Sequence, residues 1–223
     1  MRISTVAPFA LVLVFALPAP AAHAADSGVG QMLTLDDVPS VVGTVPPGVD
    51  PVSFTVPARG LELCDTALGS WQVQVAGPAT VSEVVIPTSS SGTSGLSELA
   101  YVYPSEADAQ KAWINLRSAA KACNRTEKKS QPDVGAVTST VTTGYFPGVT
   151  AYPDLWINHR DVYSGAAGRR QGTIVRFSVF SQSTNAILVT SGTSTTTPKG
   201  FTREQREAVR ALAQKLSDRW DVR

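Results

Sequence analysis

A regular alternation of apolar and polar residues in the C-terminal half constrains the fold of this chain most strongly. In the segment 173–180, the apolar residues Val175, Phe177 and Val179 occupy every second position. A period of two is typical of a β-strand that buries one face. Further strand patterns cover residues 137–146, 155–163 and 186–191, and turn residues occupy 165–172 and 182–185. Neighbouring strands with short turns between them predict an antiparallel sheet.

The N-terminal half carries weaker strand signals. Short strand patterns occur at 71–75, 84–86 and 98–103, and the Ser/Gly-rich run 88–97 is typical of a surface loop. Residues 44–57 contain four prolines, and residues 124–133 are polar and basic. Both stretches lack apolar periodicity, so we expect them to be connections.

Helix signals occur in three places. Ser105 and Asp108 have capping-box spacing before a run of apolar residues that recur at helical spacing up to Cys123. Thr202 and Gln205 open a last helix over about 203–220, whose apolar face is Val209, Leu212, Ala213, Leu216 and Trp220. A short helix is expected within 33–43. The pattern predicts an α+β fold, an antiparallel sheet flanked by helices in a single domain.

The N-terminus has the features of an export signal. A basic start is followed by the apolar stretch 6–17 and by Ala22-His23-Ala24, which predicts cleavage after Ala24. We expect residues 25–30 to be a disordered start and 31–223 to form the domain. In the oxidising compartment outside the cell, two cysteines without metal-type spacing favour one disulfide, Cys64 to Cys123. No cysteine stands at the cleavage point, so an acyl anchor is not expected.

Composition excludes several classes of partner. The 19 basic residues, of which Arg2 belongs to the signal, balance 18 acidic ones, so charge does not favour nucleic acid. No apolar run beyond the signal approaches the roughly 18–20 residues that span a bilayer, so the mature protein is not expected to cross one. The sequence therefore predicts a secreted, extracellular protein.

Catalytic and metal signals are sparse. His159 is the one histidine outside the signal, no G-x-S-x-G motif occurs, and the acids match no zinc or EF-hand spacing. Asp36 and Asp37 fit a helix N-terminus, and a carboxylate pair such as Glu62 and Asp154 remains open for glycosidase chemistry.

Basic residues and aromatics offer weaker functional signals. Arg169 and Arg170 lie in a Gly-rich turn that fits a hairpin better than an anion-binding nest. A lysine and arginine cluster at 121–129 matches a helix C-terminus, with contact to a cell-wall polyanion as the alternative. Aromatic residues concentrate between 143 and 164, where they pack a core or line a cleft.

The chain resembles the PknH-like extracellular domain family, named after the sensor domain of a mycobacterial serine/threonine kinase. The resemblance spans about 31–223 and is carried by the segments 33–38 and 101–109, and by Cys123-Asn124-Arg125-Thr126 after the helix. It implies exported actinobacterial proteins with a helix-flanked antiparallel sheet, a ligand cleft and no catalytic residues. Members usually carry two disulfides; this sequence keeps the one matching Cys64 and Cys123, and it has no kinase segment.

We therefore expect a secreted, non-enzymatic ligand-binding or sensor-type domain of the cell envelope, without a cofactor or metal. Its partner is an unidentified envelope-derived ligand or protein. Trp156, Tyr163 and Arg176 are the expected wall residues of the cleft, because they combine aromatic area with one cation on neighbouring strands. Two alternatives stay open: a secreted hydrolase acting on cell-wall or other extracellular substrate, and an envelope interaction protein without a small-molecule pocket.

Overall fold

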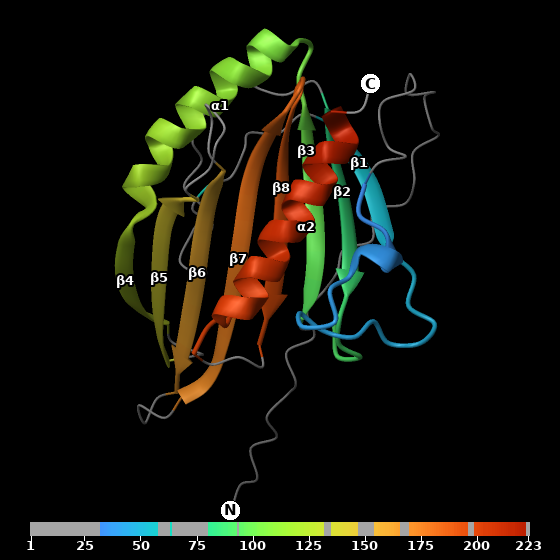
Figure 1. Cartoon of the computed structure of the whole chain (residues 1–223). Coiled ribbons are helices and arrows are strands. Elements are labelled where there is room, and N and C mark those ends of the chain that lie inside the picture. Colours follow the sequence, from blue (N-terminus) through green and yellow to red (C-terminus); the bar gives the residue numbers. More distant parts are fainter. Residues whose placement is uncertain are drawn as a thin grey trace, which may run out of the picture.

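One eight-stranded antiparallel sheet dominates the molecule (Figure 1). The computed structural model describes residues 32–57, 63, 80–92, 94–131, 135–146, 154–165, 170–195 and 199–221. Its strands are β1 (Val52–Pro57), β2 (Thr80–Pro87), β3 (Gly95–Val102), β4 (Arg125–Gln131), β5 (Gly135–Tyr145), β6 (Leu155–Ser164), β7 (Arg170–Ser183) and β8 (Ala186–Ser194). Its helices are the 3-10 turn η2 (Leu35–Asp37), α1 (Glu106–Ala120), the 3-10 turn η3 (Lys121–Cys123) and α2 (Arg203–Asp221).

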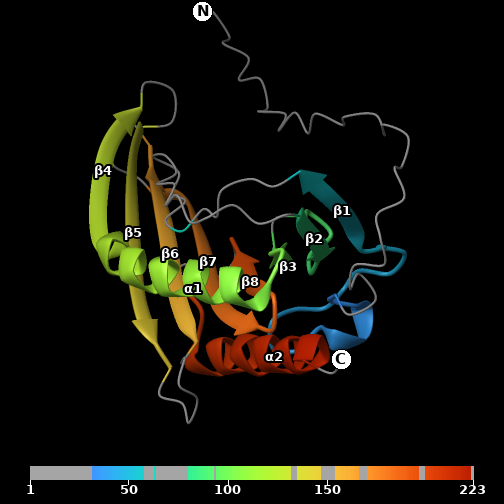
Figure 2. The same ribbon diagram turned by 90° about the horizontal axis from the view of Figure 1, so that it is seen from above.

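The strand order is β1-β2-β3-β8-β7-β6-β5-β4, which joins two meanders. The strands β1 to β3 form the first, β4 to β8 form the second, and pairing of β3 with β8 makes them one sheet. Helix α1 leads from β3, in the middle of the sheet, to β4 at its edge. Figure 2 shows a curved sheet with β1 and β4 at the two ends of its arc.

The two long helices cover opposite faces of the sheet. Consecutive residues of a strand point to opposite faces, and Val179 packs in the cluster of α2 while Phe180 packs in the cluster of α1. Helix α2 runs across β7 and β8 (Figure 1). We call the two sides the α1 face and the α2 face.

Both long helices form where the sequence predicts them. The Ser105 hydroxyl caps α1 by accepting the Asp108 amide at 3.2 Å, and the helix buries Ala109, Ala112, Trp113 and Leu116. The Thr202 hydroxyl accepts the amide of Gln205 at 3.2 Å, and the Gln205 side chain accepts the Thr202 amide at 3.0 Å. The expected apolar face of α2 is buried, including Val209, Leu212, Leu216 and Trp220.

The expected fold class needs correction, since the sheet is larger and the helices fewer than predicted. Residues 52–57 and 125–131 were predicted to be connections but form β1 and β4, and the helix expected within 33–43 is only the turn η2. The expected single disulfide is not found as a bridge among the described residues, and Cys64 lies outside them. Cys123 is fully buried at the end of η3 and is not a free thiol.

Three other sequence predictions fall outside the described residues. They are the signal 1–24, the disordered start 25–30 and the strand 71–75. In the part of the chain that the structure describes, no helix combines the length and apolar composition of a membrane span.

Candidate functional site

The strands at the centre of the sheet change character along the α1 face. On β8, Ile187 and Val189 are followed on the same face by Ser191 and Thr193. The same change, from apolar to polar, occurs on β7 between Phe180 and Ser178, and on β3 between Leu99 and Ser97. The α1 face is therefore apolar at one end of these strands and polar at the other.

Strand register gathers the polar positions into one band. Ser97 pairs with Ser191, which pairs with Ser178, and the hydroxyl oxygens of Ser178 and Ser191 are 2.8 Å apart. One row further along, His159 pairs with Arg176, and Arg176 pairs with Thr193. Helix α1 packs on the apolar end of the face, where its core cluster includes Tyr101, Phe180 and Ile187. The polar band lies beyond the part of the sheet that α1 covers.

A cavity of about 430 Å³ lies over this band. Hydroxyl groups and the charged residues Glu83 and Arg176 form part of its lining, while Leu63, Leu99 and Ile157 supply apolar surface. A concave site with apolar walls and a few convergent polar groups is the usual form of a small-molecule site. We call it the α1-face cavity.

His159 lines the α1-face cavity, and the carboxylate of Asp161 lies beside its imidazole ring. Its Nε2 lies 3.0 Å from Oδ1 of Asp161, and the hydroxyl of Ser139 donates a hydrogen bond to the same oxygen. A serine nucleophile needs its hydroxyl against the imidazole, with the acid on the other side of the ring. Here the acid stands between the hydroxyl and the imidazole, so this arrangement does not give Ser139 a histidine base.

The three expected wall residues do not converge on one cavity. Arg176 lines the α1-face cavity. Tyr163 follows His159 and Asp161 on the same face of β6 but is not among the residues that line this cavity. Trp156 points to the other side of the sheet, where it lines a second cavity beside the start of α2.

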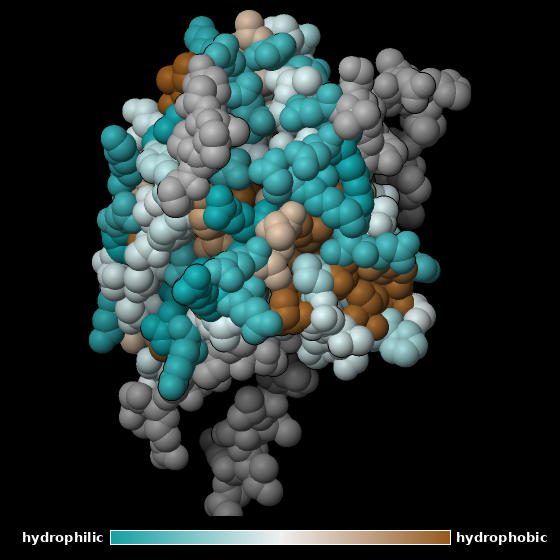
Figure 3. All heavy atoms as spheres, viewed as in Figure 1, coloured by the Kyte–Doolittle hydropathy of each residue, from teal (hydrophilic) through white to brown (hydrophobic). Residues whose placement is uncertain are grey.

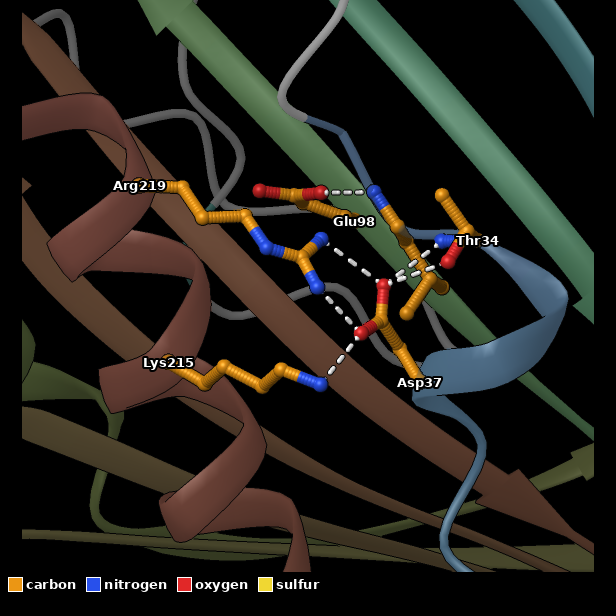
Figure 4. Close-up of polar contacts among 6 residues, drawn as sticks. Thr34, Asp37, Glu98, Lys215 and Arg219 are labelled. Carbon is orange, nitrogen blue, oxygen red and sulfur yellow. Dashed lines mark hydrogen bonds and ion pairs between the residues drawn. The ribbon is translucent and has the colours of Figure 1, made fainter.

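Asp37 lies in a cluster of charged residues on the α2 face (Figure 4). Arg219 donates to both its carboxylate oxygens, at 2.8 Å from Nη1 to Oδ2, and Nζ of Lys215 lies 2.8 Å from Oδ1. The amide and hydroxyl of Thr34 donate to Oδ2 at 2.9 and 2.8 Å. Burial opposes ionisation, but these hydrogen bonds outweigh it and hold the pKa of Asp37 well below its usual range.

Glu98 is a second acid in this cluster and is fully buried on β3. Its Oε2 accepts the amide of Leu33 at 2.6 Å, while Oε1 has no hydrogen-bond partner among the described residues. Burial raises the pKa of Glu98 to about 7, although the Leu33 amide and the charge of Arg219 act against this rise. The two acids tie the N-terminal segment to β3 and α2, which is a structural role (Figure 4).

The remaining candidate residues lie only partly within the described ranges. Burial raises the pKa of Asp154, while the nearby Ser181 hydroxyl and the charge of Arg210 act against this rise. Its suggested partner, Glu62, lies outside the described residues, as does Arg169. Asp36 is exposed. Across the ranges that the structure describes, no three His, Cys, Asp or Glu residues are placed to hold a metal ion together.

Comparison with solved structures finds a protein of similar fold. The crystal structure of the extracellular domain of PknH from Mycobacterium tuberculosis superposes with a TM-score of 0.55 at 15% sequence identity, over 87% of this chain and 94% of that one. This similarity establishes the fold. No family model matches the sequence, and no curated protein matches it either. The expected resemblance to the PknH domain is therefore confirmed for the fold alone.

Sequence reasoning missed most of the α1-face cavity. It placed Ser178 and Arg176 on one face of a strand, but it did not single out Glu83, Ser97, Ser191 or Thr193. A local signal existed, because several strands pass from apolar to polar along one face. Which strands lie side by side is decided by pairing of β3 with β8, and the sequence pattern does not reveal that pairing.

Proposed function

We propose that this protein is an exported, non-catalytic ligand-binding domain of the sensor type, which acts in the bacterial cell envelope after cleavage behind Ala24. The observation that carries the proposal is the α1-face cavity, which has polar and apolar lining where α1 leaves the sheet uncovered. The PknH-like fold supports the sensor type, because the matched structure is an extracellular domain.

Binding is favoured over catalysis by the geometry around His159. The Ser139 hydroxyl is committed to Asp161, so this cluster lacks the nucleophile–base contact of a hydrolase. The lining instead offers hydrogen-bonding groups beside apolar surface, which suits an amphiphilic envelope component.

The test is a binding screen of the purified protein against cell-wall glycans, lipids and peptides. We expect saturable binding of one class, with the ligand recovered chemically unchanged. Ser97→Leu, which fills the cavity, and Arg176→Ala, which removes its cation, should each weaken that binding at least tenfold. Lys128→Ala on the exposed edge strand β4 is the matched control and should leave it unchanged.

Two outcomes would replace this function. Turnover of a screened compound that His159→Ala abolishes would make the protein a hydrolase. An absence of binding by any compound, with capture of an envelope protein unaffected by Ser97→Leu, would make it an interaction protein without a small-molecule site.

A further inference from the structure

The α2 face carries a second cavity, of about 420 Å³, between the first turns of α2 and the strands β5 and β6. It lies on the opposite side of the sheet from the α1-face cavity. Its lining comes from Trp156 and Phe177 on the sheet, Phe146 just after β5, and arginines of α2. We call it the α2-face cavity.

Arginines form one wall of the α2-face cavity. Arg203, Arg206 and Arg210 are spaced three and four residues apart, so they share one stripe of α2 beside its buried face. Glu207 lies in the same stripe and pairs with Arg203 at 2.7 Å. Three cations face one acid among the lining residues, and Asp154 interacts with Arg210 beside them, so the wall keeps a net positive charge. The N-terminal end of the helix dipole adds to this positive field.

Aromatic rings form the other wall. The ring centroids of Trp156 and Phe177 are 6.3 Å apart, and the guanidinium of Arg210 lies 4.2 Å from the centroid of Phe146. Trp156 lies against Gly144 of the neighbouring strand so closely that a Cβ at that glycine would be 2.7 Å from Cε2 of the indole. The glycine therefore makes room for the indole against the sheet, beside the arginine wall.

A ring surface beside arginines fits a ligand that carries both an apolar face and a negative charge. Arginine binds carboxylate and phosphate groups through paired hydrogen bonds, and aromatic rings give contact area at little entropic cost. Asn158 and Thr142 add amide and hydroxyl groups to the lining, which suit sugar hydroxyls. We propose that the α2-face cavity binds an acidic saccharide, with a sugar ring on Trp156 and its carboxylate or phosphate on the arginines.

The test measures calorimetric binding of trigalacturonate and of glucose 6-phosphate to the purified protein. Two reference compounds separate the requirements: methyl-esterified trigalacturonate keeps the rings without the charge, and tri-L-glutamate keeps the charge without the rings. We expect at least one acidic saccharide to bind roughly tenfold tighter than both references, as one lost charged contact or ring contact implies. If neither does so, the proposal fails.

Charge variants test the arginine wall. Glu207→Gln removes the negative charge that pairs with Arg203. We expect it to tighten binding several-fold, because Arg203 is then no longer neutralised by Glu207 and attracts the anionic ligand more strongly. This pair is exposed on both sides, at 87% and 61%, so the variant should fold normally. Arg203→Gln should weaken binding, and Lys128→Ala should not change it. Weaker binding by Glu207→Gln would contradict an anionic ligand.

Sheet variants locate the site. Trp156→Leu keeps an apolar side chain but removes the aromatic rings, and should reduce affinity roughly tenfold, with a melting curve recorded to show that the variant is folded. Ser97→Leu, on the other face, should leave saccharide binding intact even if it abolishes binding in the α1-face cavity. Loss of saccharide binding in Ser97→Leu but not in Trp156→Leu would move the ligand to the α1 face and overturn the proposal.

Discussion

At the scale of single residues, two buried acids of the same cluster make opposite contributions to the pH dependence of stability. Asp37 is kept ionised by Arg219, Lys215 and Thr34, whereas burial raises the pKa of Glu98 to about 7. The difference follows from their partners, since Asp37 receives two cations and Glu98 receives one backbone amide. Each acid therefore makes its own contribution to the pH dependence of stability.

Glu98 should destabilise the fold as pH rises. Its pKa is raised from 4.5 to about 7 in the folded protein, so the folded state binds more protons than the unfolded state between these values. The stabilisation is complete below pH 4.5 and is lost as pH rises through 7, by roughly 3 kcal/mol from the pKa difference. Urea unfolding of Glu98→Gln between pH 4 and 8 should show a flatter profile than the unchanged protein. Identical slopes would show that Glu98 titrates normally.

Asp37 should stabilise the fold above its unfolded pKa of 3.8, and this contribution is lost as pH falls below that value. Asp37→Asn leaves Arg219 and Lys215 without their anion. We expect a loss of about 1–3 kcal/mol at pH 7, less than for a fully buried pair because both cations are partly exposed. Chemical denaturation measures it, with Asp36→Asn at an exposed neighbour as the control. Equal stability of the two variants would contradict the role of the cluster.

At the scale of elements, α2 is the helix whose burial matters most for the α2 face. Leu212 is 4% exposed and packs in the cluster that includes Val175, Phe177 and Leu188. Leu212→Ala should cost about 2–5 kcal/mol, because it leaves a cavity in a packed core. Gln214→Ala, at an exposed position of the same helix, should change stability by only a few tenths of a kcal/mol. A similar midpoint for both variants would show that α2 is not packed as described.

The strands that escaped prediction are the two edges of the sheet. Sequence patterns identify strands by one buried apolar face, and β4 (RTEKKSQ) is mostly exposed and highly charged. Strand β1 is preceded by Pro51 and ends at Pro57, and both prolines are typical of turns. It also leaves Val52 and Phe54 exposed. Edge strands carry charge and proline to avoid pairing with other molecules, which removes the pattern that would reveal them.

Lysines on β4 should protect this edge from association. Lys128 and Lys129 point to opposite sides of the strand and are both exposed. Replacing both with valine should leave the thermal midpoint within a few degrees and increase light scattering on heating or concentration. Lys121→Val, an exposed lysine just after α1, is the control. Unchanged solubility of the double variant would show that another feature guards the edge.

At the scale of the whole molecule, the sheet separates two potential binding surfaces. The α1-face cavity is lined by hydroxyl groups and by one acidic and one basic residue, Glu83 and Arg176. The α2-face cavity is lined by arginines and aromatic rings. Each arises where a helix covers only part of a face, since the α1-face cavity lies over the polar band that α1 leaves uncovered and the α2-face cavity lies beside the first turns of α2. The α2 face shows hydrophilic surface along the helix and hydrophobic surface gathered beside it, over the N-terminal segment (Figure 3).

The sequence by itself determined the elements whose signals are local. Capping residues and helical spacing located α1 and α2, and alternation located the strands β5 to β8, because both patterns depend on a helix or strand burying one side. The antiparallel class followed from the short turns. None of these signals depends on contacts between distant parts of the chain.

Only the tertiary structure decided the size of the sheet, the pairing of β3 with β8 and the face on which each site residue lies. Trp156 and Arg176 sit on neighbouring strands, yet they serve opposite faces, because a single step along a strand reverses the side chain. Glu98 accepts the amide of Leu33 across 65 residues of sequence, and Asp37 accepts Arg219 across 182 residues (Figure 4). Ser97 and Ser191 pair across the join of the two meanders. Such contacts form only once the hydrophobic faces have packed, so no local pattern encodes them.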